Sequence, residues 1–159
     1  MSDLPSTVEI HEEGPREGFQ IEPGPISTVD KVKLIDALSK TGLKHIQACS
    51  FVNPRLVPGW ADAEKVVESF DAHEDVEYTG LYFNGNGLDR ALAFKDKLTI
   101  SGSISLTASE GFTKKNLNRT HAENMAAMER HVMSHLELGI PVNRIGVMAA
   151  FGCNYQGDI

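Results

Sequence analysis

Short apolar runs alternate along the chain with stretches in which apolar residues recur every three or four positions. The short runs are typical of β-strands, and the recurring pattern is typical of amphipathic helices. Strands are predicted at VEIH (8–11), KHIQACSFV (44–52), VEYTGLYFN (76–84), KLTISGSISL (97–106) and RIGVMAAF (144–151). Five strands separated by helices indicate repeated βα units, and therefore an α/β fold with parallel strands.

The helices between these strands have recognisable ends. One is capped by Ser27 or Thr28 and stops near Gly42, which can adopt the left-handed conformation that ends a helix. Further helices are predicted at 62–73, 87–95 and 120–138. No linker or change of composition interrupts the series, so we expect residues 1–159 to belong to a single domain.

Composition and charge narrow the classes of function. The chain has 159 residues, of which 41% are apolar and 23% charged, as in a folded globular protein with a sizeable core. A net charge of -7 argues against a nucleic-acid partner, because phosphate binding needs a basic face. Cys49 and Cys153 lack the spacing of a metal site or a disulfide framework. Without a targeting signal or a run of about 20 apolar residues, we expect a cytoplasmic protein with no membrane partner.

Polar residues gather where the predicted strands end. The segment EEGPREGFQIE (12–22) follows the first strand, and its Gly14-Pro15 and Gly18 control the backbone on both sides of Arg16 and Glu17. The G-x-G-x-x-G turn of a doubly wound nucleotide-binding sheet is missing there. In the alternative α/β class, the eight-stranded barrel, active-site residues lie at the carboxyl ends of the strands. The pattern therefore favours a barrel.

Four segments at these strand ends resemble motifs of the hydroxymethylglutaryl-CoA lyase family. GPREGFQIE resembles GPRDGLQNE, and SFVNPRLVPGWAD resembles SFVSP-x-x-VP-x-x-x-D. SEGFTKKNLN is similar to SE-x-FTKKNIN, and FGCNYQGDI is similar to LGCPYEGKI. The motifs occur in the family's order between Val8 and Ile159.

The resemblance implies a metal-dependent TIM-barrel enzyme. Its expected reaction is the carbon-carbon cleavage of a 3-hydroxy-3-methylglutaryl-CoA-like acyl-CoA thioester to acetyl-CoA and a keto acid, a step of leucine catabolism, with Mg²⁺ or Mn²⁺ as the cofactor. A complete (β/α)8 barrel takes about 250 residues. We therefore expect this chain to be the N-terminal part of the barrel, with about five βα units. It would lack the family's His-x-His pair and catalytic cysteine loop, be inactive alone and associate as a homo-oligomer through exposed edges.

The resemblance also implies roles for two residues of the first motif and for Gln47, which lies in the strand just before the second motif. Arg16 is expected to be catalytic, because a guanidinium can neutralise the enolate oxygen that forms as the carbon-carbon bond breaks. Glu17 stands where the family has a metal-binding aspartate. Gln47 stands where the family has a glutamate near the reacting hydroxyl, and an amide cannot act as a general base. The two replacements suggest a related acyl-CoA substrate, or a loss of activity.

Further residues at the strand ends are expected to bind substrate: Gln20, Ser50, Asn84, Lys114, Lys115 and Asn116. Asn84 can instead cap the next helix, and the two lysines can be ordinary solvated charges. His45, near a strand start, is interpreted as structural.

Two other functions remain as alternatives. One is a related condensing enzyme, although GPREG differs from the T-L-R-D-G of those synthases. The other is a binding or assembly protein built on an inactive partial barrel.

Overall fold

The computed structural model describes residues 4–24 and 26–159, which divide into two compact units, Met1–Ile100 and Ser101–Ile159. The first unit contains β1 (His11–Glu12), α1 (Gly14–Ile21), α2 (Thr28–Leu38), β2 (His45–Ser50), the 3-10 helix η1 (Pro58–Trp60), α3 (Ala63–Ser69), β3 (Glu77–Leu81) and α4 (Gly85–Leu92). The second contains β4 (Gly102–Thr107), α5 (Glu110–Leu117), α6 (His121–Glu137) and β5 (Val142–Met148). None of the helices in this described part of the chain is long and apolar enough to cross a lipid bilayer.

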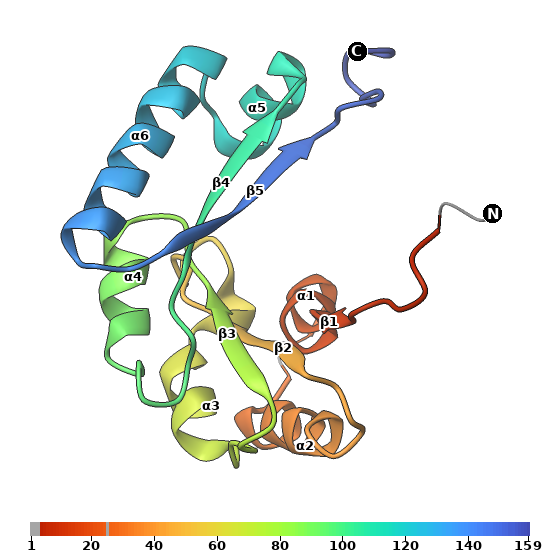
Figure 1. Cartoon of the computed structure of the whole chain (residues 1–159), viewed down its shortest axis with the longest axis vertical. Helices are drawn as coiled ribbons and strands as arrows, with labels where there is room; N and C mark the ends of the chain where they lie inside the picture. The colour runs from red at the N-terminus through yellow and green to blue at the C-terminus, as the bar shows by residue number, and fades with distance from the viewer. Residues whose placement is uncertain (1–3, 25) are drawn as a thin grey trace. The chain divides into compact units, whose positions relative to one another are not determined.

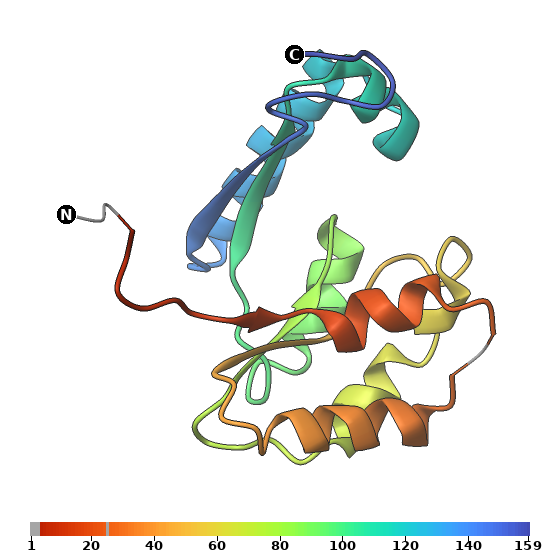
Figure 2. The same cartoon turned by 90° about the vertical axis from the view of Figure 1, so that its right-hand side faces the viewer.

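The first unit is built on a parallel sheet in the order β1-β2-β3. Ile46 and Ala48 of β2 are fully buried in a core to which α2 and α3 also contribute. Figure 1 shows these two helices beside the sheet. Figure 2 shows the same helices and strands from another side. Because side chains alternate along a strand, His45 and Gln47 lie on the opposite, less covered face of β2. This face carries Gln47, one of the residues that the sequence analysis expects at the active site.

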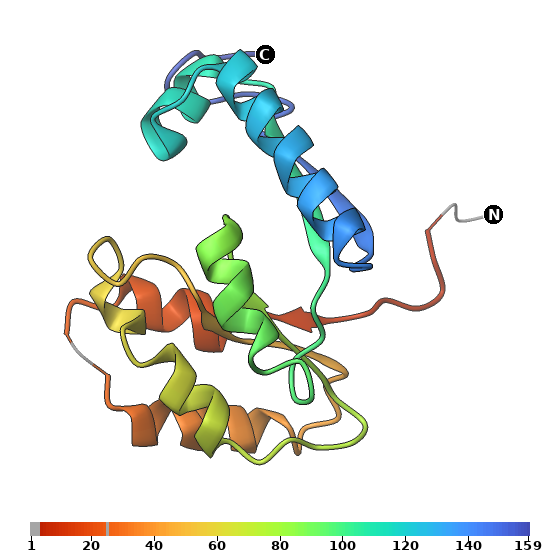
Figure 3. The ribbon, with the colours of Figure 1, turned by 90° about the vertical axis from the view of Figure 1, so that its left-hand side faces the viewer.

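The second unit consists of the parallel pair β4–β5 with α6 packed against both strands, as Figure 3 shows. Thr120 begins α6 with a complete capping box, in which its side chain accepts from the N–H of Glu123 and the Glu123 carboxylate accepts from the N–H of Thr120. Ile145 and Val147 of β5 are exposed over more than half of their surface. A parallel sheet is normally covered on both faces, so these residues are unusual for an isolated unit.

The predicted parallel βα pattern is confirmed, with differences at the element ends. The first strand begins at His11 instead of Val8, because Val8 and Ile10 are exposed and make no ladder with β2. The fourth strand begins at Gly102 instead of Lys97. The helices that begin after Ser27 and Thr120 start where the capping pattern places them, and Gly42 has the predicted positive φ of 91°.

Two helices, α1 and α5, occupy segments that the sequence pattern leaves as strand-end loops. Helix α1 begins with Gly14-Pro15, and proline is favoured in the first turn, where its missing N–H costs nothing. Helix α5 begins after Ser109, whose side chain accepts a hydrogen bond from the N–H of Phe112. Both helices have only eight residues, too few for an apolar period to be recognised.

A buried cation joins two of the helices that cover the first sheet. The side chain of Lys31, on α2, is only 2% exposed, and its Nζ lies 2.6 Å from Oδ1 of Asp62. The same Nζ donates to the carbonyl of Gly59 at 2.5 Å and lies 4.7 Å from the centre of the Trp60 ring. Burial alone would raise the pKa of Asp62, but hydrogen bonds from Lys31 and Thr28 hold this pKa below its ordinary value.

The change Asp62→Ala should lower the free energy of unfolding by on the order of 3 kcal/mol, because it leaves a buried ammonium without its counter-charge. The depressed pKa means that the carboxylate stabilises the folded protein above the ordinary aspartate pKa, and that this contribution is lost as the pH falls further. Urea denaturation followed by the fluorescence of Trp60, the single tryptophan, measures both effects.

The matched control is Lys33→Met on the same helix, which removes an exposed pair with Asp30 at 3.6 Å. This change should cost less than about 1 kcal/mol. Equal losses in the two variants would show that the Lys31–Asp62 pair has no special importance.

Candidate active site

Arg16 lies in the first turn of α1, directly after β1, and its side chain is 11% exposed. Its Nε donates to Oε1 of Gln47 on β2 at 2.5 Å. One terminal nitrogen lies 2.8 Å from a carboxylate oxygen of Glu13, and the other contacts the carboxylate of Glu17. The carbonyl of Arg16 accepts a hydrogen bond from the indole N–H of Trp60 at 3.1 Å. The guanidinium is therefore held by side chains from both α1 and β2.

The guanidinium stays charged although it is largely removed from water. Burial lowers the pKa of Arg16, and the charge and hydrogen bond of Glu13 oppose this shift. An arginine has five N–H donors, and the three side-chain contacts leave donors over for a further acceptor. A fixed, partly unsatisfied cation of this kind suits an oxygen on which negative charge develops.

Glu17 is the expected metal ligand, and its side chain is about half exposed beside Arg16. A carboxylate oxygen is the donor that Mg²⁺ and Mn²⁺ prefer, so the residue suits a hard cation at one coordination position. Within residues 4–24 and 26–159, however, Glu17 belongs to no group of three possible His, Cys, Asp or Glu ligands. No group of this kind therefore supplies further ligands for a cation held by Glu17.

The other expected residues of the first unit differ in burial and in hydrogen bonding. Gln20 lies one turn after Arg16 on α1 and is half-buried. Ser50, at the end of β2, is fully buried, and its Oγ has no hydrogen-bond partner among the described residues. A buried hydroxyl without a partner is uncommon and needs an explanation, such as a ligand. Asn84 caps α4 by accepting a hydrogen bond from Gly87 N at 3.0 Å, so the capping role is observed and its contact with substrate stays a prediction.

In the second unit, the expected residues Lys114, Lys115 and Asn116 all lie on α5 and are exposed to solvent. They belong to a helix and not to the strand-end loop that the sequence pattern indicates. Their exposure leaves the two ammonium groups available to an anionic partner, and their role in binding CoA phosphates stays a prediction.

Two groups of contacts have no counterpart in the sequence analysis. Glu13 and Trp60 hold Arg16, and only the position of Glu13, three residues before Arg16, was a usable signal. In the second unit, Ser109 Oγ lies 3.0 Å from Sγ of Cys153 and 2.5 Å from the amide oxygen of Gln156. Ser109 is more than forty positions away from both Cys153 and Gln156 in the sequence, so only the fold brings it to them.

Comparison with known proteins gives a consistent result. No family model matches the chain. The cytoplasmic 3-hydroxy-3-methylglutaryl-CoA lyase of Rattus norvegicus is 39% identical over 160 residues, which cover 100% of this chain and 45% of the rat protein. The mitochondrial hydroxymethylglutaryl-CoA lyase of Gallus gallus is 39% identical over 156 residues, covering 98% and 51%. The chain is homologous to the N-terminal part of hydroxymethylglutaryl-CoA lyases.

Solved structures of lyases in this family agree in fold. The lyase of Pseudomonas aeruginosa matches with a TM-score of 0.88 at 31% identity, covering 99% of this chain and 51% of the other. A lyase of Acinetobacter baumannii in complex with coenzyme A and 3-methylmalate matches with a TM-score of 0.81 at 31% identity, covering 100% and 50%. The chain therefore spans about half the length of the lyases it matches, and its fold is that of the corresponding part of their TIM barrel.

The two cysteines should differ strongly in reactivity. The hydrogen bond from Ser109 lowers the pKa of the Cys153 thiol, whereas burial raises the pKa of the Cys49 thiol. Since the thiolate is the reactive form, iodoacetamide at pH 8 should modify Cys153 and spare Cys49 in the folded protein. Mass spectrometry of the peptides reads the two sites separately, and fast labelling of Cys49 would contradict the structure.

The change Ser109→Ala should move the alkylation profile of Cys153 to higher pH, because the thiolate loses its hydrogen-bond donor. Thr120→Ala is the matched control, since it removes another helix cap of the second unit without touching the thiol. The pH dependence of Cys153 alkylation should be unchanged in this control. A similar shift in both variants would show that the effect comes from a general loss of structure in the second unit.

Proposed function

We propose that the chain forms part of a carbon-carbon lyase that cleaves a 3-hydroxy-3-methylglutaryl-CoA-like thioester to acetyl-CoA and a keto acid. The observation that carries the proposal is the buried guanidinium of Arg16 at the strand ends of a chain homologous to such lyases. The activity would reside in a barrel that these residues form together with the remaining strands. The expected setting is a cytoplasmic homo-oligomer acting in leucine catabolism.

Arg16 would meet the negative charge that develops on the thioester oxygen when the carbon-carbon bond breaks. Gln47 and Glu13 fix the plane of the guanidinium, so its remaining donors are oriented before the substrate arrives. Pre-oriented donors of this kind cost no reorganisation during the reaction, which is why they accelerate it. Gln47 would act as the positioning residue for Arg16 and not as the base.

Glu17 would provide one oxygen ligand for the divalent cation, Mg²⁺ or Mn²⁺. When bound, such a cation lowers the pKa of a coordinated alcohol and holds its substrate in place. The contact between Glu17 and Arg16 keeps the carboxylate next to the guanidinium. The residue that would hold the cation and the residue that would stabilise the enolate are therefore neighbours.

The CoA portion of the substrate would bind through the polar residues of α5. The Acinetobacter baumannii lyase matched by this chain was solved with coenzyme A bound. Lys114 and Lys115 would attract the phosphates, and Asn116 would donate to them. Gln20, Ser50 and Asn84 would contact the acyl part, and the free hydroxyl of Ser50 is the strongest structural support among the three.

Glu17 and Gln47, in place of aspartate and glutamate, favour a substrate related to hydroxymethylglutaryl-CoA over that thioester itself. The longer side chain of Glu17 would hold the cation in a shifted position. The neutral amide of Gln47 removes an acid-base group from beside the reacting hydroxyl. An inactive binding protein is the alternative, which the complete barrel would reveal by showing no turnover with either cation.

In the complete barrel, Arg16→Lys should lower kcat by about 10²- to 10³-fold, because an ammonium cannot replace the planar donors of a guanidinium. The measurement is the rate of acetyl-CoA release at saturating substrate, together with circular dichroism to verify folding. The control Arg55→Lys changes an exposed arginine that follows β2 and should leave the rate unchanged. Near-normal turnover of Arg16→Lys would make Arg16 a purely structural residue.

The double change Glu17→Asp with Gln47→Glu should shift preference toward 3-hydroxy-3-methylglutaryl-CoA. The shorter side chain at position 17 would hold the cation as in the related lyases, and the restored carboxylate at position 47 would accept the proton of the hydroxyl. The values of kcat/KM for a panel of 3-hydroxyacyl-CoA thioesters should change non-additively, since both residues contact Arg16. If the unmodified enzyme already prefers hydroxymethylglutaryl-CoA and the double variant gains nothing, the different-substrate idea is wrong.

A further inference from the structure

Glu9, His11 and His45 form a cluster of metal-binding side chains in the first unit. One ligand atom from each residue lies within 4.8 Å of the other two. Across residues 4–24 and 26–159, no other group of three His, Cys, Asp or Glu residues meets this condition. Glu9 precedes β1, whereas the two histidines are the first residues of β1 and β2.

The parallel register of the sheet builds the cluster. His11 of β1 pairs with His45 of β2, which in turn pairs with Glu77 of β3. Residues paired in register project from the same face of a sheet. The two imidazole rings are accordingly stacked, with their centres 4.1 Å apart and their planes 11° from parallel.

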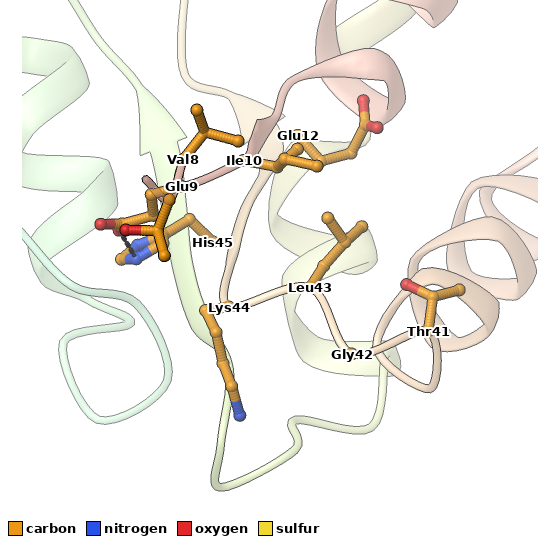
Figure 4. Close-up of a pocket in the computed structure, with 10 residues that line it drawn as sticks. Val8, Glu9, Ile10, Glu12, Thr41, Gly42, Leu43, Lys44 and His45 are labelled. Atoms are coloured by element: carbon orange, nitrogen blue, oxygen red, sulfur yellow. Dashed lines mark ion pairs between the residues drawn. The ribbon is translucent and has the colours of Figure 1, made fainter. Parts of the chain in front are cut away.

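One carboxylate oxygen meets both rings. Oε1 of Glu9 lies 3.2 Å from Nε2 of His11 and also contacts Nε2 of His45. Figure 4 shows Glu9 reaching His45 from the segment before β1. The other ring nitrogen of His45, Nδ1, lies 3.4 Å from a carboxylate oxygen of Glu77.

Two imidazole nitrogens and one carboxylate oxygen are a donor set that suits Zn²⁺, whose sites often combine three protein ligands with a water molecule. Histidine ligands commonly direct their second nitrogen to a carboxylate, which fixes the ring and strengthens the ligand. Glu77 stands in that place relative to His45. We propose that Glu9, His11 and His45 bind a divalent transition metal, zinc fitting best, with Glu77 as a positioning residue for His45.

The proposed site is open to solvent. Glu9 and His45 line a pocket of about 960 Å³ whose other walls are Thr7, Val8, Ile10, Glu12, Thr41, Gly42, Leu43 and Lys44 (Figure 4). The side chains of Glu9 and His11 are both more than half exposed. A metal ion can therefore enter directly and keep a water ligand.

The metal would hold the segment from Glu9 to His11 against β2. Only two residues of β1 pair with β2, and residues 4–10 before them are exposed and in no strand. The metal would tie Glu9 and β1 to β2 at the end of the sheet opposite Arg16. Because β1 leads within four residues to Arg16, this structural metal would also limit the movement of α1.

Zinc titration by calorimetry tests the proposal. The background is Glu17→Gln with Cys153→Ser, which removes the ligand proposed for the catalytic cation and the reactive thiol. We expect one equivalent of Zn²⁺ to bind, and Co²⁺ at the same site to give the visible absorption of a four-coordinate ion. His11→Ala or His45→Gln should abolish this binding, and Glu77→Gln should weaken it about 10- to 100-fold.

His73→Ala is the matched control, because His73 is an exposed histidine of the same unit outside the cluster. It should bind zinc like the background protein. Zinc should also raise the thermal unfolding midpoint in the background and in His73→Ala, but not in His45→Gln. Absence of zinc binding, or binding unaffected by His11→Ala and His45→Gln, would overturn the proposal. Neither readout depends on lyase activity, so the result is independent of the proposed function.

Discussion

The position of Arg16 depends on one constraint, the burial of its guanidinium between an unusual helix and the second strand. Helix α1 contains Gly14 and Gly18, residues with low helix propensity, so tertiary contacts have to hold it in place. Its anchors are the side chain of Gln47 and the indole of Trp60. Trp60 also lies beneath the ammonium of Lys31, so the same network reaches the helix layer behind the sheet. Changes in that layer should therefore alter the position of Arg16.

The sequence predicted the elements whose apolar pattern or cap is local. It did not predict contacts between residues that are far apart in the sequence. Strand β2 and helix α6 were recognisable, because their apolar positions or caps are local. The burial of Lys31 was not, since a lysine on a helix is ordinarily solvated and its partner Asp62 lies 31 positions away. Likewise, Arg16, Glu17 and Gln47 were expected at the site from the family motifs, but the anchoring by Trp60 required the fold.

Gln47 illustrates how the structure changes the meaning of a residue. From the sequence, it is a lost acid-base group. In the structure its amide oxygen accepts from Arg16 Nε, so the residue keeps a geometric function without a charge. Arg16 already has two carboxylate neighbours, Glu13 and Glu17. A third negative charge would further neutralise the guanidinium, so the neutral amide preserves more of its positive potential.

The face of β2 that is not covered by α2 and α3 carries both groups for which we propose a role. His45 and Gln47 are two positions apart on this face, about 7 Å along the strand. Gln47 orients Arg16, whereas His45 joins Glu9 and His11 at the strand start. Sequence analysis interpreted His45 as structural from its position, and the proposed metal agrees with that role while adding a ligand. Only Glu12 to Pro15 separate His11 from Arg16 along the chain, so the metal we propose at the strand start would also restrict the segment that carries the guanidinium.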